Sequence, residues 1–345
     1  MTYADDAQPS IEWLAWLAQE ADRLAAGVEA SHADNLILGQ ALTDAEVQNG
    51  ELQSELLKSQ TTEARLRARI ATLREKLAAC QNPAIPAPTM LVGTALSRET
   101  GETYADAWNR RVNNWGAEPE AVRYFDPDWK LDNWPVFNNA RCYASFKGTP
   151  AEVLSGVHDA YYEDLFSRAP KDRDVYWTYY HEPEDNIQNK EFAADQYRRA
   201  FDHIAAIEDQ SSNSSRIFRG PILMGWTANP QSGRIYRNYI PSVMIDFIGW
   251  DIYTGLDERD IRTKYGYCSQ ATQDAGVDSW IIAETAPRVD QNWTQAQLAQ
   301  WIPLAAQVAR DLDYEVWCYF DSTVGGDFRI KSPEACAAMG AEIAK

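Results

Sequence analysis

The sequence predicts an α/β fold, a (β/α)8 TIM barrel, preceded by an N-terminal α-helical coiled coil. Two observations support this prediction. A heptad pattern of apolar residues runs from Leu14 to Cys80, and eight short apolar runs alternate with helical patterns after a proline-rich stretch. We therefore expect a helical oligomerisation stalk in 1–81, a linker in 82–89 and a barrel in 90–345.

The expected stalk keeps one heptad register throughout. Fifteen of its twenty a and d positions are apolar. A stripe of this period is fully covered only by a partner helix, so we expect self-association as a dimer or a trimer. Asn35 and Asn49 at a positions favour two strands. Gly27, Gly39 and Gly50 each weaken the helix by about 1 kcal/mol, which leaves an intramolecular helical hairpin packed on the barrel as the alternative.

The stretch Asn82–Pro88 reads NPAIPAP. Each proline disfavours the helical conformation of the residue before it. We therefore expect an extended, semi-rigid spacer at the domain boundary.

Eight strand candidates follow this spacer. Each is a short run of apolar and aromatic residues that ends in polar or aromatic ones. The expected strands are Leu91–Ser97, Ala121–Asp126, Arg141–Lys147, Val175–Tyr180, Ile222–Thr227, Phe247–Tyr253, Trp280–Thr285 and Glu315–Asp321. Amphipathic stretches such as Glu191–Glu208 and Thr294–Asp311 lie between them, and this alternation predicts parallel βαβ units closed into a barrel.

An open, doubly wound sheet is the alternative fold. No G-x-G-x-x-G or Walker loop follows any of the strands, which disfavours it. One connection departs from the barrel pattern, because only about fourteen residues separate the second and third strands. We expect a loop or a single turn there in place of an outer helix.

Composition and charge exclude several classes of partner. The chain has 51 acidic and 32 basic residues, a formal charge of −19, which disfavours nucleic acid and anionic membrane surfaces. Its five cysteines include no C-x-x-C pair, so we expect free thiols, no metal and no cofactor. The N-terminus lacks the basic and apolar regions of a signal peptide, and no apolar run is long enough to span a membrane.

Two glutamates stand at the ends of expected strands. Glu182 follows the fourth strand, where Pro183 ends the ladder, and Glu284 closes the seventh strand. In a barrel both carboxylates would point into the crater at the C-terminal face, where the chemistry of such folds is carried out. Two carboxylates flanking a sugar bond are the minimum equipment for glycoside hydrolysis.

This arrangement resembles the clan A glycoside hydrolases. His181-Glu182 is similar to the fourth-strand motif of glycoside hydrolase family 26, and Ile245–Tyr253 is similar to the sixth strand of that family. Arg123 resembles the second-strand arginine of the wider clan. The resemblance covers the layout of 90–345 but rests on these three short motifs. Pro183 after the acid and the Glu-Thr-Ala of the seventh strand depart from the family pattern.

The resemblance implies a retaining mechanism and assigns roles to these residues. Glu182 would be the general acid and base, and Glu284 the nucleophile, with their carboxyl groups about 5 to 5.5 Å apart. Tyr253 and Arg123 would hold Glu284 ionised. His181 would orient the acid or bind a sugar hydroxyl, although it could equally be a hydrogen-bonded structural histidine.

Further side chains near the strand ends are candidates for sugar contact, because aromatic rings stack on sugars and carboxylates accept from their hydroxyls. They are Asp251, Trp250, Trp226, Trp317 and Tyr319. Strand alternation prevents all of them from facing inward.

A metal cluster of His181, Glu182, Glu184 and Asp185 is a weaker interpretation, because adjacent residues at a strand end point in different directions. A Ser-His-Asp triad is weaker still, because no G-x-S-x-G motif is present. The sequence favours a retaining glycosidase on a stalk that acts on a β-linked host cell-surface polysaccharide, as in a phage tail or virion protein. Such a protein would be virion-associated or extracellular, and otherwise cytoplasmic. The alternatives are a non-catalytic glycan-binding attachment protein and a purely structural tail protein.

Overall fold

The computed structural model describes residues 15–16, 18–30, 63, 67, 70, 89–125, 131 and 133–345. The chain divides into two units, Met1–Thr89 and Met90–Lys345. The expected spacer, residues 82–88, lies outside the described residues, and so does most of the expected stalk.

The described part of the first unit contains a helix over residues 18–30. Leu24 and Val28 on this helix pack against Ile70, and all three side chains are buried. All three occupy a or d positions of the heptad register. The apolar stripe is thus covered in part by residues of the same chain, as the hairpin alternative expects, and self-association through a coiled coil stays a prediction.

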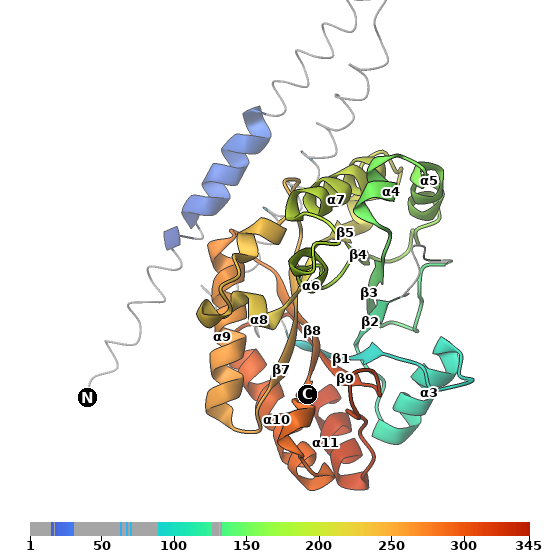
Figure 1. The fold of residues 1–345 in the computed structure, drawn as a ribbon, viewed down its shortest axis with the longest axis vertical. Coiled ribbons are helices and arrows are strands. Elements are labelled where there is room, and N and C mark those ends of the chain that lie inside the picture. The colour runs from blue at the N-terminus through green and yellow to red at the C-terminus, as the bar shows by residue number, and fades with distance from the viewer. Residues whose placement is uncertain are drawn as a thin grey trace, which may run out of the picture. The chain divides into compact units, whose positions relative to one another are not determined.

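The second unit is built on nine parallel strands (Figure 1). They are β1 (Leu91–Leu96), β2 (Ala121–Phe125), β3 (Arg141–Phe146), β4 (Val175–Tyr179), β5 (Ile217–Arg219), β6 (Ile222–Met224), β7 (Ile248–Thr254), β8 (Trp280–Pro287) and β9 (Val316–Asp321).

Helices follow most of these strands. They are α3 (Tyr104–Trp115), α4 (Pro150–Leu154), α5 (Asp159–Ser167), α6 (Glu184–Gln188), α7 (Ala194–Glu208), α8 (Gly225–Ala228), α9 (Glu258–Asp274), α10 (Gln295–Asp311) and α11 (Pro333–Ile343). The expected amphipathic stretches correspond to α7 and α10, and Thr294 caps the N-terminus of α10. Between β2 and β3 the described residues, 131 and 133–140, form no helix, which agrees with the expected loop. None of the described helices is both long and apolar enough to cross a membrane.

The sheet runs in the order β5-β4-β3-β2-β1-β9-β8-β7-β6. Its two end strands are consecutive in the chain and are separated only by Gly220 and Pro221. Backbone hydrogen bonds continue across this break, from Gly220 N to Trp177 O on β4 and from Gly249 N on β7 to Pro221 O. The sheet therefore curls back on itself, and the prediction of a TIM-like α/β fold is confirmed at this level.

The fifth strand differs from the expected Ile222–Thr227. It begins earlier, at Ile217, and breaks in the middle, because Pro221 has no N–H to donate to the ladder. A Cβ at residue 220 would lie 2.0 Å from the carbonyl oxygen of Phe247, so only glycine fits there. The strand also ends earlier, at Met224, where α8 begins. Trp226 therefore lies on a helix.

Two layers of apolar side chains fill the unit. One lines the inside of the sheet and includes Tyr143, Ile222, Ile281 and Ala283. The other, larger layer lies between the sheet and the outer helices. Successive residues of a strand point to opposite faces, so the position of a residue within its strand determines whether its side chain faces the interior or the helices.

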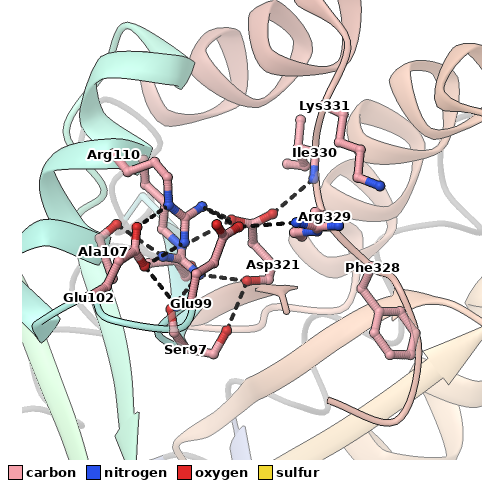
Figure 2. Close-up of polar contacts among 12 residues, drawn as sticks. Ser97, Glu99, Glu102, Ala107, Arg110, Asp321, Phe328, Arg329, Ile330 and Lys331 are labelled. Atoms are coloured by element: carbon pink, nitrogen blue, oxygen red, sulfur yellow. Dashed lines mark hydrogen bonds and ion pairs between the residues drawn. The ribbon is translucent and has the colours of Figure 1, made fainter. Parts of the chain in front are cut away.

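A buried ion pair joins the first and last parts of this unit. Arg111 of α3 is fully buried, and its Nε lies 3.3 Å from Oδ2 of Asp321 at the end of β9. The same guanidinium donates to the carbonyl oxygens of Ser97, Ala107 and Asp321. Figure 2 shows the cluster of polar contacts around Asp321, to which Arg110 and the backbone N–H of Ile330 also contribute. This cluster ties α3 to the ends of β1 and β9.

Candidate active site

The candidate site lies at the C-terminal ends of the parallel strands. Glu182 comes three residues after β4, and Glu284, Asp251 and Tyr253 come from β8 and β7. The side chain of Arg123 on β2 joins them from the opposite arc of the sheet. We call the space that these residues line the crater.

Glu284 enters the crater because of a bulge in β8. On β7 the pairing passes from Trp250–Ile282 to Asp251–Glu284, and on β9 from Trp317–Ile282 to Tyr319–Thr285. Both registers skip one residue of β8, Ala283, which is the signature of a β-bulge. Because Ala283 already faces the interior, strict alternation would send the next residue outward, and the bulge returns Glu284 to the inner face.

Glu284 is held by its neighbour on β7. The hydroxyl of Tyr253 donates a hydrogen bond of 3.2 Å to Oε2 of Glu284. Burial raises the pKa of Glu284 to about 7, although the charge of Arg123 opposes this effect. The carboxylate of Glu182 contributes to the increase, so the two carboxyl groups influence each other across the crater.

Glu182 follows an irregular turn of the backbone. Tyr180 and Glu182 have φ angles of +48° and +52°, a conformation that costs energy for residues other than glycine. The N–H of Glu182 donates to the carbonyl oxygen of Ile222 on β6, and this bond holds the turn in place. Burial raises the pKa of the Glu182 carboxyl group, while the charges of Lys147 and Arg123 lower it.

Arg123, Ser145 and His181 form a hydrogen-bonded chain on one wall of the crater. Nη1 of Arg123 donates to Oγ of Ser145 at 3.0 Å, and that Oγ lies 3.0 Å from Nδ1 of His181. An arginine only donates, so the Ser145 hydroxyl accepts from it, while the direction of its hydrogen bond with His181 depends on which ring nitrogen of the histidine carries the proton. Burial and the nearby cations hold the pKa of His181 well below its usual value, which favours the neutral imidazole.

Asp251 is a third carboxyl group in the crater. Its side chain is 4% exposed, and within the described part of the chain neither of its oxygens has a hydrogen-bond partner. Burial, followed by the charges of Glu284 and Glu182, raises its pKa well above the usual value. A protonated Asp251 can donate to a group that enters the crater.

Several candidates for sugar contact lie elsewhere. Trp250, Trp317 and Tyr319 are completely buried between the sheet and the helices. Trp250 donates to Thr272 of α9, and Trp317 donates to Tyr265 of the same helix. These three side chains belong to the core, because strand alternation turns them outward while Asp251 faces inward. Trp226 lies on α8, where it is 49% exposed.

The structure does not bring the four residues of the metal interpretation together. Glu184 is fully buried and accepts hydrogen bonds from the N–H of Met224 and the hydroxyl of Thr227. Asp185 is largely exposed and pairs with Arg234 at 2.5 Å. Among the residues that the structure describes, no group of three or more His, Cys, Asp or Glu side chains could hold a metal ion.

The sequence analysis missed three residues that matter at this site. Ser145 and Lys147 stand in and just after β3, in phase with the inward-facing Tyr143, and this period of two is a signal that could have found them. The Nζ of Lys147 lies 5.0 Å from the centre of the Tyr180 ring. In the sequence, Glu184 is a candidate only for the alternative metal cluster, and nothing in the sequence indicates that its side chain is buried.

Comparisons with solved structures agree with this fold. No protein-family model matches the sequence, and no curated protein does. A structure of fungal β-1,4-galactanases is 13% identical, covers 75% of this chain and 100% of the other, and has a TM-score of 0.50. Thermotoga maritima Cel5A, in complex with a mannotriose substrate, is 8% identical, covers 72% and 96%, and has a TM-score of 0.50. An engineered protein reaches 0.54 at 12% identity, with 74% and 70% covered. At these identities the similarity shows the fold alone.

Proposed function

We propose that the chain is a retaining glycoside hydrolase that cleaves a β-linked polysaccharide. The observation that carries this proposal is the pair of glutamates formed by Glu182, which is partly buried, and Glu284, which is buried. They come from opposite sides of one crater, and each has a raised pKa. Buried carboxyl groups that influence each other are the equipment of glycosidases of this kind.

Glu284 serves as the nucleophile. Its oxygen attacks the anomeric carbon while the bond from that carbon to the glycosidic oxygen breaks, which leaves a covalent glycosyl-enzyme. The Tyr253 hydrogen bond favours the ionised carboxylate that this attack requires. The charge of Arg123, which lowers the pKa of Glu284, acts in the same direction.

Glu182 serves first as the acid and then as the base. It gives its proton to the departing glycosidic oxygen, and burial, which raises the pKa of Glu182, favours the protonated form that this step needs. Once Glu284 is esterified its negative charge is gone, so the pKa of Glu182 falls. Glu182 can then take a proton from the water whose oxygen joins the anomeric carbon and frees Glu284.

The neighbouring donors fit a sugar ring. His181 presents the ring nitrogen that does not bind Ser145, and a protonated Asp251 presents an O–H. Sugar hydroxyls accept such bonds, and bonds of this kind that strengthen in the transition state supply part of the rate enhancement. We propose β-linked polymers because the β-1,4-galactanases share the fold at a TM-score of 0.50, although their low identity leaves the sugar open.

Reducing-end release by the full chain tests this proposal. We would incubate wild type, Glu182→Gln and Glu284→Gln with β-1,4-galactan, β-1,4-mannan, β-1,3-glucan and bacterial surface polysaccharides. Glu334→Gln, at an exposed position on α11, is the matched control. We expect wild type and the control to cut at least one polymer, and the two site variants to be slower by about a thousandfold. The hydrolase proposal fails if no polymer is cut, or if both site variants remain as active as wild type. Polymer binding without cleavage would favour the attachment protein.

We also propose that the N-terminal segment presents the barrel as an oligomer, as a phage tail or virion component would on a host surface. The heptad register over Leu14–Cys80 supports this proposal. The contact of Leu24 and Val28 with Ile70 in the same chain favours a helical hairpin, which can itself be a protomer of a bundle. Light scattering of the full chain over a range of concentrations tests it, and a monomer at every concentration would contradict self-association.

A further inference from the structure

The crater has a wall of donors opposite a wall of carboxyl groups. Arg123, Ser145, Lys147 and His181 come from the neighbouring strands β2, β3 and β4. Asp251, Tyr253 and Glu284 come from β7 and β8 across the sheet. Glu182 stands at the end of the donor wall, so a ligand beside Glu182 contacts that wall.

The ammonium group of Lys147 is part of the donor wall. Among the described residues, none hydrogen-bonds or forms an ion pair with its Nζ, and its near neighbour is the ring of Tyr180. Its charge nevertheless interacts with Glu182, Asp251 and Glu284, which places it in the crater. The side chain is partly buried, so keeping it unpaired there has a desolvation cost.

Arg123 also has N–H groups without an acceptor among the described residues. Its side chain is fully buried, and within the described residues its Nε and Nη2 have no acceptor. Buried guanidinium N–H groups are nearly always paired in folded proteins. The donor wall therefore offers N–H groups on two cations that the protein itself does not use.

The proposed mechanism requires an ionised Glu284 and a protonated Glu182. Burial raises the pKa values of Glu182 and Asp251, which favours the neutral form of each carboxyl group. His181 is neutral, and Arg123 is always charged. Burial lowers the pKa of Lys147, but an anion placed beside it favours its charged form. With Glu182 in its acid form, the N–H groups of Lys147 and Arg123 that have no acceptor among the described residues are free to bind an anionic ligand.

A polar hollow elsewhere in this unit differs from the crater in how its cations are paired. It has a volume of about 710 Å³ and lies between α3 and the start of α11. Its arginines are already matched, since Arg110 binds Glu102 at 2.7 Å and Arg329 binds Asp327 at 2.9 Å. The arginines of this hollow thus have carboxylate partners within contact distance, which Lys147 lacks among the described residues.

We propose that Lys147, supported by Arg123, binds the carboxylate of an acidic sugar, so that the substrate of this site is a polysaccharide containing uronic acid residues. This inference rests on the proposed function, from which we take that the ligand is a sugar. The binding of an acidic sugar does not itself depend on bond cleavage. Lys147 is a substrate-binding residue in this role and takes no part in proton transfer.

Binding of monosaccharides to the full chain tests the inference. The probes are D-glucuronate and D-galacturonate, each compared with D-glucose or D-galactose, from which it differs only by the carboxylate at C6. Dissociation constants would be measured by NMR titration for wild type, Lys147→Met and the control Lys190→Met, whose lysine is exposed on the turn after α6. Sodium acetate is the probe for an anion without a sugar.

We expect wild type and Lys190→Met to bind at least one uronate about tenfold to a hundredfold more tightly than its neutral counterpart, the range of one charge-assisted hydrogen bond. Lys147→Met should bind the two equally. The inference is overturned if wild type shows no preference, if Lys147→Met keeps it, or if acetate binds as tightly as the uronate. These measurements follow binding and not cleavage. If the cleavage experiment fails, they still test whether the site prefers acidic sugars, and if they fail, the cleavage experiment still tests the hydrolase proposal.

Discussion

The hydroxyl of Tyr253 donates to Oε2 of Glu284 at 3.2 Å, across two neighbouring parallel strands, β7 and β8. The bond exists because the bulge at Ala283 turns Glu284 to the side of the sheet that Tyr253 already faces. Tyr253 also remains a protonated donor, because burial raises its pKa well above the usual value. The bulge in β8 thus places the proposed nucleophile beside a donor that favours its ionised form.

Tyr253→Phe should therefore lower activity most at acidic pH. Without the donor, the ionised form of Glu284 is less stable and the pKa of this carboxyl rises above its value of about 7. A hydrogen bond to a charged group contributes about 1.5 to 3 kcal/mol, so we expect a loss of about tenfold to a hundredfold. The acid limb of the kcat/KM profile should move to higher pH. Tyr267→Phe, on the outer helix α9, is the control, and an unchanged acid limb in Tyr253→Phe would contradict the role.

Glu182→Ala should be rescued by azide. A small anion can occupy the space left by the carboxyl group and attack the glycosyl-enzyme without a general base. With an aryl β-glycoside that wild type cleaves, we expect azide to restore turnover and to give a β-glycosyl azide, identified by NMR. Formation of the α-azide would mean a single displacement, and would contradict both retention and the expected carboxyl separation of about 5 to 5.5 Å.

Arg111→Met should destabilise the barrel far more than a comparable change at the surface. The substitution leaves the buried carboxylate of Asp321 with only partial compensation, from Arg110 at 3.5 Å and from the N–H of Ile330 (Figure 2). Breaking a buried pair in this way typically costs about 3 to 5 kcal/mol. Arg262→Met, which removes an exposed pair with Glu258 and Asp311, should cost less than about 1 kcal/mol. Urea unfolding followed by fluorescence measures both, and equal losses would show that Arg111 contributes no more than a surface arginine.

The parallel strands and outer helices were predictable from the sequence because their signals are periodic. The amphipathic stretch that became α10, for instance, has its buried side chains on one face and Thr294 as its N-cap. The fifth strand was placed too late in the chain, because Gly220-Pro221 marks a break within a strand as readily as the end of one. The heptad register could not determine whether Leu24 and Val28 meet another chain or Ile70 of the same chain.

The candidate site was predictable in its residue types but not in its geometry. Strict alternation from Ala283 points Glu284 outward, so its inward position depends on a bulge that the letters WIIAET do not reveal. The left-handed backbone of Glu182 is likewise unexpected for a glutamate. Trp250 and Trp317 show the converse, because both are expected as sugar contacts from their places near the strand ends, whereas the strand period turns them into the core.

Glu184 should make the barrel less stable as the pH rises. Burial raises its pKa in the folded chain to about 8, against about 4.5 unfolded, so between these values the folded state holds a proton that the unfolded state has lost. Stability is then highest below about pH 4.5 and falls toward pH 8, by at most about 1.4 kcal/mol per pH unit for one such group. Glu284, with a pKa of about 7, acts with the same sign.

Glu184→Gln should remove this contribution while keeping an oxygen that accepts from Met224 N–H and the Thr227 hydroxyl. The free energy of unfolding of the variant relative to wild type should therefore increase between pH 5 and pH 8, as measured by urea unfolding at several pH values. Glu334→Gln should leave the slope unchanged, because the pKa of that exposed carboxyl is lowered, so it is ionised in both states above pH 5. Parallel curves for wild type and Glu184→Gln would mean that Glu184 is already ionised in the folded barrel, stabilised by the two donors that reach its Oε1.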